Sequence, residues 1–308
     1  MKNEPITLVF NASDEQPSRL DRFLFSALPT YSRTYFHDLI ERGLVKVNSR
    51  QVTKPSLTLK HNDSITVELL IKSYNVEPFA VDFKVLDTQD DFIVIDKPAG
   101  LVVHQAHTGD TAPSLVNGLL YHFKEFTAFD DAQRPGIVHR IDKDTSGLLL
   151  VARHHIAQKE LSALFKQRAI KKTYLAVVHG HPNQQGTIDL PIGRSFKERH
   201  KMSHAGFCSR SAHTEYTVLA RYADTALVAV NLITGRTHQI RVHFAAIGHP
   251  LVGDKTYGKP SPLINRQALH AWKMAFEYKG KMHTYHNILP ADMKQLLSQL
   301  NTKNDSEK

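Results

Sequence analysis

Two carboxylates in one polar segment are the side chains of this sequence best placed to do chemistry. Asp142 and Asp144 lie in residues 139–153, where a charge-dense stretch runs straight into the apolar run at residues 148–151. A rigid strand behind such a loop can hold a carboxylate at the rim of a sheet, where it serves as a nucleophile or as a general base. The spacing does not choose between the two aspartates, and both could instead cap turns.

A second segment, residues 234–244, combines two arginines with two histidines. Arg236, His238, Arg241 and His243 fall where a strand-like stretch passes into a helical one. Backbone N–H groups at the start of a helix and guanidinium groups both favour a phosphate or a carboxylate, so these residues predict an anion site. The alternative is that they are partly buried and hydrogen-bond to the loop backbone.

Metal and serine-hydrolase chemistry find little support. The chain has 19 histidines and one cysteine, Cys208, but it contains neither His-Glu-x-x-His nor Cys-x-x-Cys. His238 and His243 are spaced five apart, which is a poor pairing on a helix. Ser146 lies near His139 without the Gly-x-Ser-x-Gly turn of a serine nucleophile. We therefore expect no metal site and no hydrolase.

The elements that must position these segments form the larger part of the chain. Hydrophobic patterning predicts strands over residues 92–96, 148–151, 173–178, 214–219 and 226–232, and helices over 112–123, 154–168 and about 238–247. Several adjoining strands have hairpin-length connections, so we expect a mixed, mainly antiparallel sheet with helices packed on it, over residues 81–300. The polar residues 301–308 are expected to be a disordered tail.

A smaller module precedes this domain. Residues 18–28 carry Leu20, Phe23, Leu24 and Leu28 at the spacing of an amphipathic helix, and Ser32 and Gly43 are suited to cap a second helix over 33–42. Short strands are predicted at 44–47 and 65–69, with a turn at 48–50. We expect a domain over residues 15–72, a leader at 1–14, and a linker at 73–80, where the pattern loses periodicity and includes Pro78. The whole chain is therefore predicted to be an α+β protein.

The composition favours a cytoplasmic protein that meets a polyanion. The chain has 308 residues, a formal charge of +9 and a pI near 9.4. Residues 166–201 alone hold eight basic side chains against two acidic ones, although this stretch could simply be a solvated face. No run of about 18 apolar residues is present to cross a membrane, and one cysteine fits a reducing compartment.

The front module resembles the alpha-L RNA-binding domain, which is named from a ribosomal protein. The residues that carry the resemblance are Arg19-Leu20-Asp21-Arg22-Phe23-Leu24, Ser32-Arg33 and residues 43–48. In such domains, basic residues around the second helix and the hairpin meet phosphates. The resemblance therefore implies RNA contacts for Arg33, Lys46 and Arg50, which could otherwise be ordinary surface charges.

The larger domain resembles the RluA-type pseudouridine synthases. Their signature loop matches His139-Arg140-Ile141-Asp142 followed by Thr145-Ser146-Gly147-Leu148. Four more motifs match in the family order, one before this loop at residues 97–104 and three after it at 172–178, 235–241 and 249–254. Two mild departures are Ile141 in place of Leu, and Gln105 where Pro is commoner. The two matches together cover most of the chain, with an architecture similar to members that act on large-subunit ribosomal RNA.

The resemblance implies a role for each site residue. Asp142 would attack the anomeric carbon or act as a base toward the 2′ position, and these two routes stay open. Arg241 would keep that carboxylate ionised, Tyr174 would stack on the flipped uracil, and Arg140 would fill the space that the base leaves. The remaining expected RNA contacts are His139, Arg236 and His238. The isomerisation needs no metal, nucleotide or redox cofactor.

The resemblance also implies a partner, which is structured RNA. Ribosomal RNA is favoured because the front domain accompanies family members that act there; transfer RNA and a ribosomal subunit precursor are the other candidates. We expect a monomer. The rival from another class is a non-catalytic RNA-binding or ribosome-assembly protein with the same fold, which the intact Asp142, Tyr174 and Arg241 set disfavours.

Overall fold

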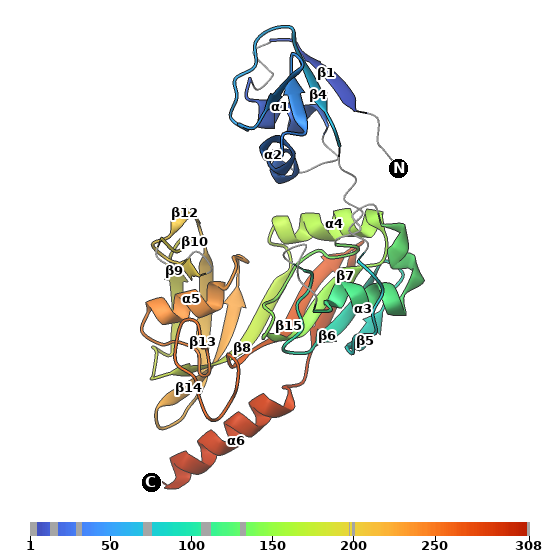
Figure 1. The fold of residues 1–308 in the computed structure, drawn as a ribbon. Coiled ribbons are helices and arrows are strands. Elements are labelled where there is room, and N and C mark those ends of the chain that lie inside the picture. The colour runs from blue at the N-terminus through green and yellow to red at the C-terminus, as the bar shows by residue number, and fades with distance from the viewer. Residues whose placement is uncertain are drawn as a thin grey trace. The chain divides into compact units, whose positions relative to one another are not determined.

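The chain divides into two compact units, Met1–Ser73 and Tyr74–Lys308, called here the front unit and the main unit (Figure 1). The computed structural model describes residues 5–12, 18–28, 33–69, 76–105, 112–129, 134–196, 198 and 201–306. The expected N-cap, Ser32, lies outside these residues.

The front unit consists of a four-stranded antiparallel sheet with two helices. The strand order is β1-β4-β2-β3, formed by β1 (Ile6–Phe10), β4 (Asp63–Val67), β2 (Val45–Val47) and β3 (Arg50–Val52). The helices are α1 (Leu20–Ala27) and α2 (Arg33–Glu41). Leu20, Phe23 and Leu24 are buried on the inner face of α1, as the helical spacing predicts. Gly43, at φ +73°, ends α2 in the left-handed conformation that favours glycine.

The expected leader at residues 1–14 is wrong for its middle part. β1 pairs with β4 along its whole length, from Ile6 opposite Val67 to Phe10 opposite Asp63, and Phe10 is buried. The sheet of the front unit is completed by this strand. Its stability depends on a ladder with a distant segment, and such a ladder leaves only a short local pattern in the sequence.

The main unit is built on a nine-stranded sheet. Its order is β5-β6-β7-β15-β8-β14-β13-β9, and β16 pairs with β15 off this path. The strands are β5 (Lys84–Thr88), β6 (Phe92–Lys97), β7 (Ser146–Ala152), β8 (Lys171–His179), β9 (Gln185–Asp189), β13 (His213–Arg221), β14 (Thr225–Leu232), β15 (Leu269–Tyr278) and β16 (Lys281–His286). All five predicted strands are present. Only β7 and β15 pair in parallel among these described strands, so the expected mixed, mainly antiparallel sheet is confirmed.

The sheet brings β7 and β15 unusually close at the start of β7. Gly147 lies opposite Ala271 with φ +114°, and a Cβ at this glycine would approach the carbonyl oxygen of Ala271 to 2.3 Å. A side chain would therefore push the two strands apart. Because β7 begins only four residues after Asp142, this contact fixes where the polar loop leaves the sheet.

Helices pack against the sheet (Figure 1). They are α3 (Leu115–His122), the 3-10 turn η1 (Lys124–Ala128), α4 (His155–Lys166), α5 (Gln239–Ala246) and α6 (Ala291–Ser306). The three predicted helices correspond to α3, α4 and α5. The expected disordered tail at 301–308 is wrong up to Ser306, because α6 continues through it; Met293, Leu296 and Leu300 anchor the preceding turns in an apolar cluster.

A separate three-stranded sheet lies beyond β9 in the sequence. Its order is β11-β10-β12, from β10 (Ile192–Arg194), β11 (Met202–Ser203) and β12 (Phe207–Arg210). Hydrophobic patterning predicts no strand in this stretch, where only the excess of basic residues stands out. No helix among the described residues is long and apolar enough to cross a membrane.

Candidate active site

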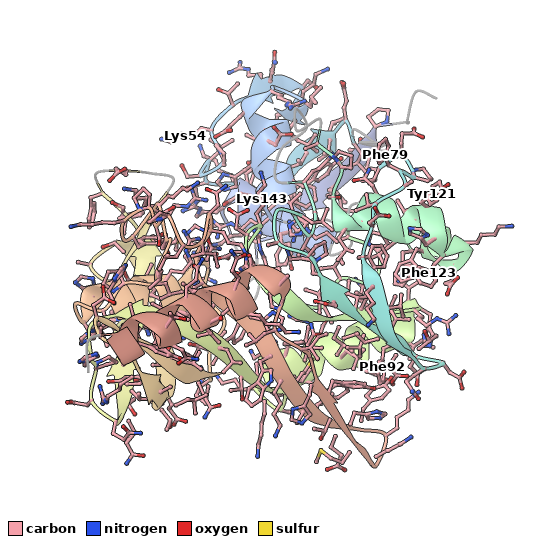
Figure 2. All side chains as sticks on the ribbon, turned by 90° about the horizontal axis from the view of Figure 1, so that it is seen from below. Lys54, Phe79, Phe92, Tyr121, Phe123 and Lys143 are labelled. Carbon is pink, nitrogen blue, oxygen red and sulfur yellow. The ribbon has the colours of Figure 1, made fainter. Side chains whose placement is uncertain are left out.

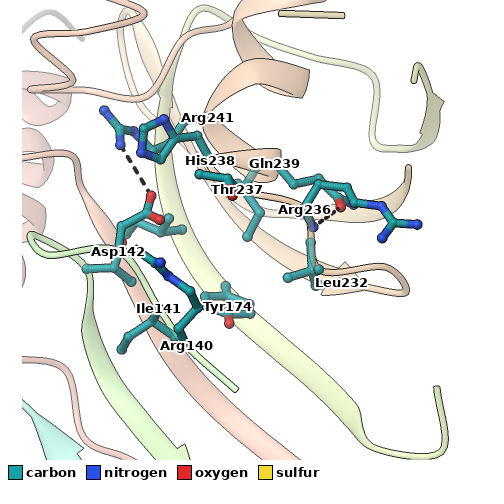
Figure 3. Close-up of a pocket in the computed structure, with 14 residues that line it drawn as sticks. Arg140, Ile141, Asp142, Tyr174, Leu232, Arg236, Thr237, His238, Gln239 and Arg241 are labelled. Carbon is teal, nitrogen blue, oxygen red and sulfur yellow. Dashed lines mark hydrogen bonds and ion pairs between the residues drawn. The ribbon is translucent and has the colours of Figure 1, made fainter. Parts of the chain in front are cut away.

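Asp142 lines a small pocket and lies on the loop that leads into β7 (Figure 3). The pocket has a volume of about 90 Å³. Its walls come from the loop at residues 140–145, from β8, from the end of β14 and from residues 235–241. The side chain of Asp142 is 18% exposed, and its main-chain oxygen accepts a hydrogen bond from the N–H of Thr145 at 3.1 Å. The turn therefore holds the carboxylate between solvent and protein.

Arg241 brings a buried positive charge to this carboxylate. It projects from α5, and its Nη1 donates to Oδ2 of Asp142 at 3.2 Å. No hydrogen bond from the described residues reaches Oδ1 of Asp142. One oxygen of the carboxylate is thus neutralised, while the other is left for a ligand in the pocket.

Asp254 orients Arg241 from the other side. Its fully buried carboxylate accepts hydrogen bonds from Nε of Arg241 at 2.7 Å and from Nη2 at 2.9 Å. The backbone N–H groups of Thr256 and Tyr257 also donate to it. Burial alone would raise the pKa of Asp254, but these donors hold it below its usual value. The two-point pairing leaves Nη1 as the guanidinium nitrogen that faces Asp142.

Tyr174 forms the apolar side of the pocket. It lies on β8, is only 6% exposed and lines the pocket with Leu232 and Leu269. Burial, and secondarily the negative charge of Asp142, raises the pKa of its phenol well above the usual value. The ring is therefore a neutral platform at neutral pH, beside the carboxylate of Asp142.

His238 and Tyr257 complete the wall around Arg241. His238 precedes α5 in the left-handed conformation, at φ +56°, and its Nδ1 lies 2.8 Å from the hydroxyl of Tyr257. The guanidinium carbon of Arg241 lies 5.0 Å from the centre of the Tyr257 ring, which is a cation–π distance. Burial lowers the pKa of His238, so the imidazole tends to be neutral.

Lys97 supports the loop at residues 140–145 from the interior of the protein. Its side chain is fully buried, and Nζ donates to the carbonyl oxygens of Pro98 and Leu101 at 2.7 Å and of Lys143 at 2.9 Å. These three acceptors match the three donors of an ammonium group. Burial lowers the pKa of Lys97 to about 7, although the nearby Asp144 and Asp142 oppose that shift.

Arg266 supports the same loop from the strand side. It is buried and pairs with Asp292, at the start of α6, through Nε at 2.6 Å and Nη2 at 3.0 Å. Its Nη1 donates to the carbonyl oxygen of Asp144 at 3.1 Å, and its Nη2 to Oγ of Ser146 at 3.3 Å. The loop that carries Asp142 is therefore held by two buried basic side chains, Lys97 and Arg266, neither of which lines the pocket.

Comparison with known proteins identifies the family. The family model described as RNA pseudouridylate synthase matches residues 91–246, and the S4 domain model matches residues 18–65. The chain belongs to the RNA pseudouridylate synthase family. Both expected resemblances, of the front module and of the larger domain, are confirmed.

Relatives match this family member over most of their length. An uncharacterized RNA pseudouridine synthase of Bacillus subtilis is 40% identical over 295 residues, covering 94% of this chain and 96% of that protein. The ribosomal large subunit pseudouridine synthase D of Zymomonas mobilis is 38% identical, covering 93% of this chain and 95% of that protein. The solved structure of human RNA pseudouridylate synthase domain containing 1 is 27% identical with a TM-score of 0.56, covering 75% of this chain and 98% of that one.

The structure brings together six of the expected site residues. Asp142, Tyr174, Arg241, Arg140, Arg236 and His238 all line the pocket. The side chain of Arg236, however, extends away from Asp142 (Figure 3), and its Nε donates to the carbonyl oxygen of Ser211 at 3.0 Å. Arg140 is exposed at the rim.

His139 does not line this pocket. Its Nε2 accepts a hydrogen bond from the N–H of Leu150 at 2.9 Å, and its ring stacks on Phe165 with centroids 4.4 Å apart. Burial, with the charge of Lys172, lowers the pKa of His139 to about 3, so the ring is neutral. These contacts favour a role in holding the loop against β7 over the expected RNA contact.

The other expected RNA contacts belong to the front unit. Arg50 is exposed, and Lys46 lies 3.7 Å from Glu68. Arg33 is 43% exposed but donates two hydrogen bonds to the buried Asp21, which Arg19 and His37 also contact. These partners outweigh the effect of burial and lower the pKa of Asp21 far below its usual value. Arg33 therefore helps to hold the front unit together.

Sequence reasoning missed Asp254, Lys97 and Arg266. Asp254 and Lys97 lie inside matched motifs, but the motifs do not predict the hydrogen-bond and ion-pair partners of these side chains. Arg266 lies outside every motif and gave no signal. Within the described part of the chain, no group of three or more His, Cys, Asp or Glu side chains is arranged to hold a metal ion.

Proposed function

We propose that this protein isomerises uridine to pseudouridine in large-subunit ribosomal RNA, and that Asp142 is the catalytic carboxylate. The observation that carries the proposal is the divided environment of Asp142: Arg241 neutralises Oδ2, while Oδ1 stays open to a pocket that Tyr174 lines. Charged nucleophiles and bases work best when one side is fixed and the other is available to substrate.

The isomerisation requires few other chemical groups from the protein. The bond between N1 of uracil and C1′ of ribose breaks, the bound base turns, and a new bond joins C5 to C1′ while a proton passes from C5 to N1. No water is consumed and nothing is oxidised, so the chemistry requires no cofactor. Oδ1 of Asp142 serves either as the nucleophile at C1′ or as the base at the 2′ position.

The pocket walls suit the remaining steps. The neutral ring of Tyr174 gives the uracil a flat surface on which to turn, beside the apolar Leu232 and Leu269. The target must leave the RNA stack to reach Asp142, which costs a few kcal/mol. Arg140, exposed at the rim, is the side chain that takes the vacated place.

The comparisons and the charge of the chain support ribosomal RNA as the substrate. Relatives named ribosomal large subunit pseudouridine synthase D match more than nine-tenths of the chain, and the front unit matches the S4 domain. A net charge of +9 favours a polyanion. Ribosomal RNA as substrate would place the enzyme in the cytoplasm. A pseudouridine map of total RNA from wild-type and deletion strains tests this, and a site lost only from transfer RNA would refute the ribosomal assignment.

Asp142→Asn, compared with Asp144→Asn, tests the chemistry. The first variant removes the charge that faces the pocket, and its single-turnover rate at saturating enzyme should fall by at least about 10²–10⁴-fold. Arg241 keeps its two-point pairing with Asp254, so the Asp142→Asn protein should remain folded and bind RNA. The second variant keeps the main-chain oxygen that Arg266 holds and should stay active. Near-normal pseudouridine formation by a folded Asp142→Asn enzyme would contradict the assignment.

A further inference from the structure

A second hollow lies next to the Asp142 pocket. It lies against the three-stranded sheet β11-β10-β12, which we call the small sheet. It has a volume of about 480 Å³, several times that of the pocket itself. β10 and β12 form its floor, and residues 235–237 form its other wall. We call this hollow the β10–β12 groove. The proposed function gives it no role so far.

The groove continues directly from the Asp142 pocket. Gly235, Arg236 and Thr237 line both, so a polymer with one unit in the pocket meets the groove with the next. Figure 3 shows the guanidinium of Arg236 turned away from Asp142, which is the direction such a chain would take. A substrate longer than one nucleotide therefore has a path across residues 235–237.

The groove is positively charged. Arg194 and Arg210, which are exposed, and Arg236 line it, and none of its described lining residues is acidic. None of these three guanidinium groups forms an ion pair with the residues that the structure describes. Like charges that line one groove repel one another, and a phosphate bound among them offsets that repulsion.

One exposed aromatic ring lines the groove, and a second lies beside that ring. Phe207, opposite Arg194 in the β10–β12 ladder, is 63% exposed, and Phe196 beside it is 73% exposed. Their centroids lie 6.2 Å apart with the rings nearly perpendicular. Large apolar side chains this exposed are commonly binding surfaces, and a base can stack on either ring.

We propose that the β10–β12 groove binds the nucleotide next to the target uridine, with its base stacked on Phe207 and its phosphate held by Arg194, Arg210 and Arg236. The inference rests on the proposed function for the identity of the target. Its consequence is that the groove takes part in choosing the uridine, through the base that follows or precedes it. Aromatic rings with arginines favour single-stranded RNA over a protein partner, because every base offers a flat face and every linkage a negative charge.

Phe207→Ala tests the stacking, with Phe79→Ala as the matched control. Phe79 is 54% exposed and lies beside α3, away from the small sheet (Figure 2). The probe is a stem-loop RNA that carries the uridine mapped in large-subunit RNA. Phe207→Ala should weaken its affinity by about 5- to 140-fold, as expected for one stacked base, while the rate at saturating enzyme stays near wild type. Phe79→Ala should change neither quantity.

An abasic scan of the same stem-loop locates the contact. Removing the base that stacks should weaken binding to the wild type but not to Phe207→Ala, since that protein has already lost the ring. Equal affinities of Phe207→Ala and Phe79→Ala would overturn the proposal. So would a Phe207→Ala defect confined to ribosomal particles and absent on naked RNA, which would assign the groove to a protein instead.

Cys208 gives a readout that needs no turnover. It is the single cysteine of the chain, is exposed and lines the groove. RNA that carries an activated-disulfide tether on the nucleotide on either side of the target should exchange with the thiolate of Cys208, which forms a mixed disulfide and releases the leaving thiol of the tether, while the Cys208→Ser protein should not react. If no RNA is converted, the proposed function fails, and crosslinking to oligouridine with the same activated-disulfide tether still tests the groove. Absence of crosslinks at every position would overturn the groove assignment alone.

Discussion

Replacing Asp254 by asparagine should disable the site without touching a group that meets the substrate. The carboxylate accepts from Nε and Nη2 of Arg241 and from two backbone N–H groups, all inside the protein. An asparagine can keep its oxygen where Oδ1 receives three of these donors. Its amide nitrogen then faces Nε of Arg241, where the native oxygen lies at 2.7 Å, so two donors oppose each other.

The size of the effect follows from this geometry. Removing one partner of a buried ion pair costs about 3–5 kcal/mol. The lower end applies here, because Arg241 keeps its contacts with Asp142 at 3.2 Å and with the ring of Tyr257. We expect the free energy of unfolding of the main unit to fall by about 3 kcal/mol. Arg241 should also turn toward Asp142 and engage both its oxygens, and a displacement of about 1 Å lowers a rate by roughly 100-fold.

Two measurements separate the effects. Urea unfolding followed by fluorescence reports the main unit, because the single tryptophan of the chain, Trp272, lies on β15. Single-turnover rates at saturating enzyme and below the unfolding transition report the chemistry. Asp21→Asn is the control: that carboxylate is equally buried and pairs with arginines, but it belongs to the front unit. It should lower the stability of the front unit while leaving both the Trp272 transition of the main unit and the turnover rate unchanged. An Asp254→Asn enzyme with wild-type rate and stability would refute this reasoning.

Two further predictions concern charge. Arg50→Glu should reduce the salt dependence of RNA affinity by about 0.7 in the log–log slope, as for one lost single-strand phosphate contact, and an unchanged slope would remove Arg50 from the interface. Arg33→Glu is unsuitable for this test because it places a carboxylate against buried Asp21. The free energy of unfolding should fall as the pH drops from 6.5 toward about 3, because the unfolded chain protonates His139 before the folded chain does. His139→Gln should flatten that part of a denaturation-versus-pH profile; an unaltered profile would contradict a neutral His139 ring in the folded protein.

Much of the fold could be predicted from local patterns of apolar and charged residues in the sequence. β7 is an uninterrupted apolar run because it is buried on both faces, and such runs are recognisable without knowing the partner strand. α5 and its preceding turn were found through their density of arginine and histidine. Both patterns can be recognised in the sequence because each extends over many neighbouring residues: an apolar run in β7, and a high density of basic side chains at α5.

The missed elements depend on distant partners. β15 reads Leu-His-Ala-Trp-Lys-Met-Ala-Phe-Glu-Tyr, and its polar residues are accepted because β7, β8 and β16 pair with different parts of it. The strands of the small sheet are only two to four residues long, and β12 is exposed throughout, so no apolar alternation marks them. Local sequence cannot carry this information, since the register is set by segments far along the chain.

The same dependence on distant partners explains which site residues could be predicted from the sequence. Asp142, Tyr174 and Arg241 were identifiable because each lies in a motif. The support by Asp254, Lys97 and Arg266 depends on which main-chain oxygens and carboxylates they reach, and only the folded chain defines those contacts. A buried charge is costly unless it is paired, so a charged residue within an apolar run is the signal that would have marked Lys97.

The position of β15 has a consequence for synthesis on the ribosome. β7 and β8 follow each other in the sequence, yet β15 lies between them in the sheet and is made about a hundred residues later. The nascent chain thus emerges with Asp142 and Tyr174 on two half-sheets that lack their shared strand. Nascent chains that end before Leu269 should hold both residues and still be inert, so the enzyme is switched on only when its last strands leave the exit tunnel.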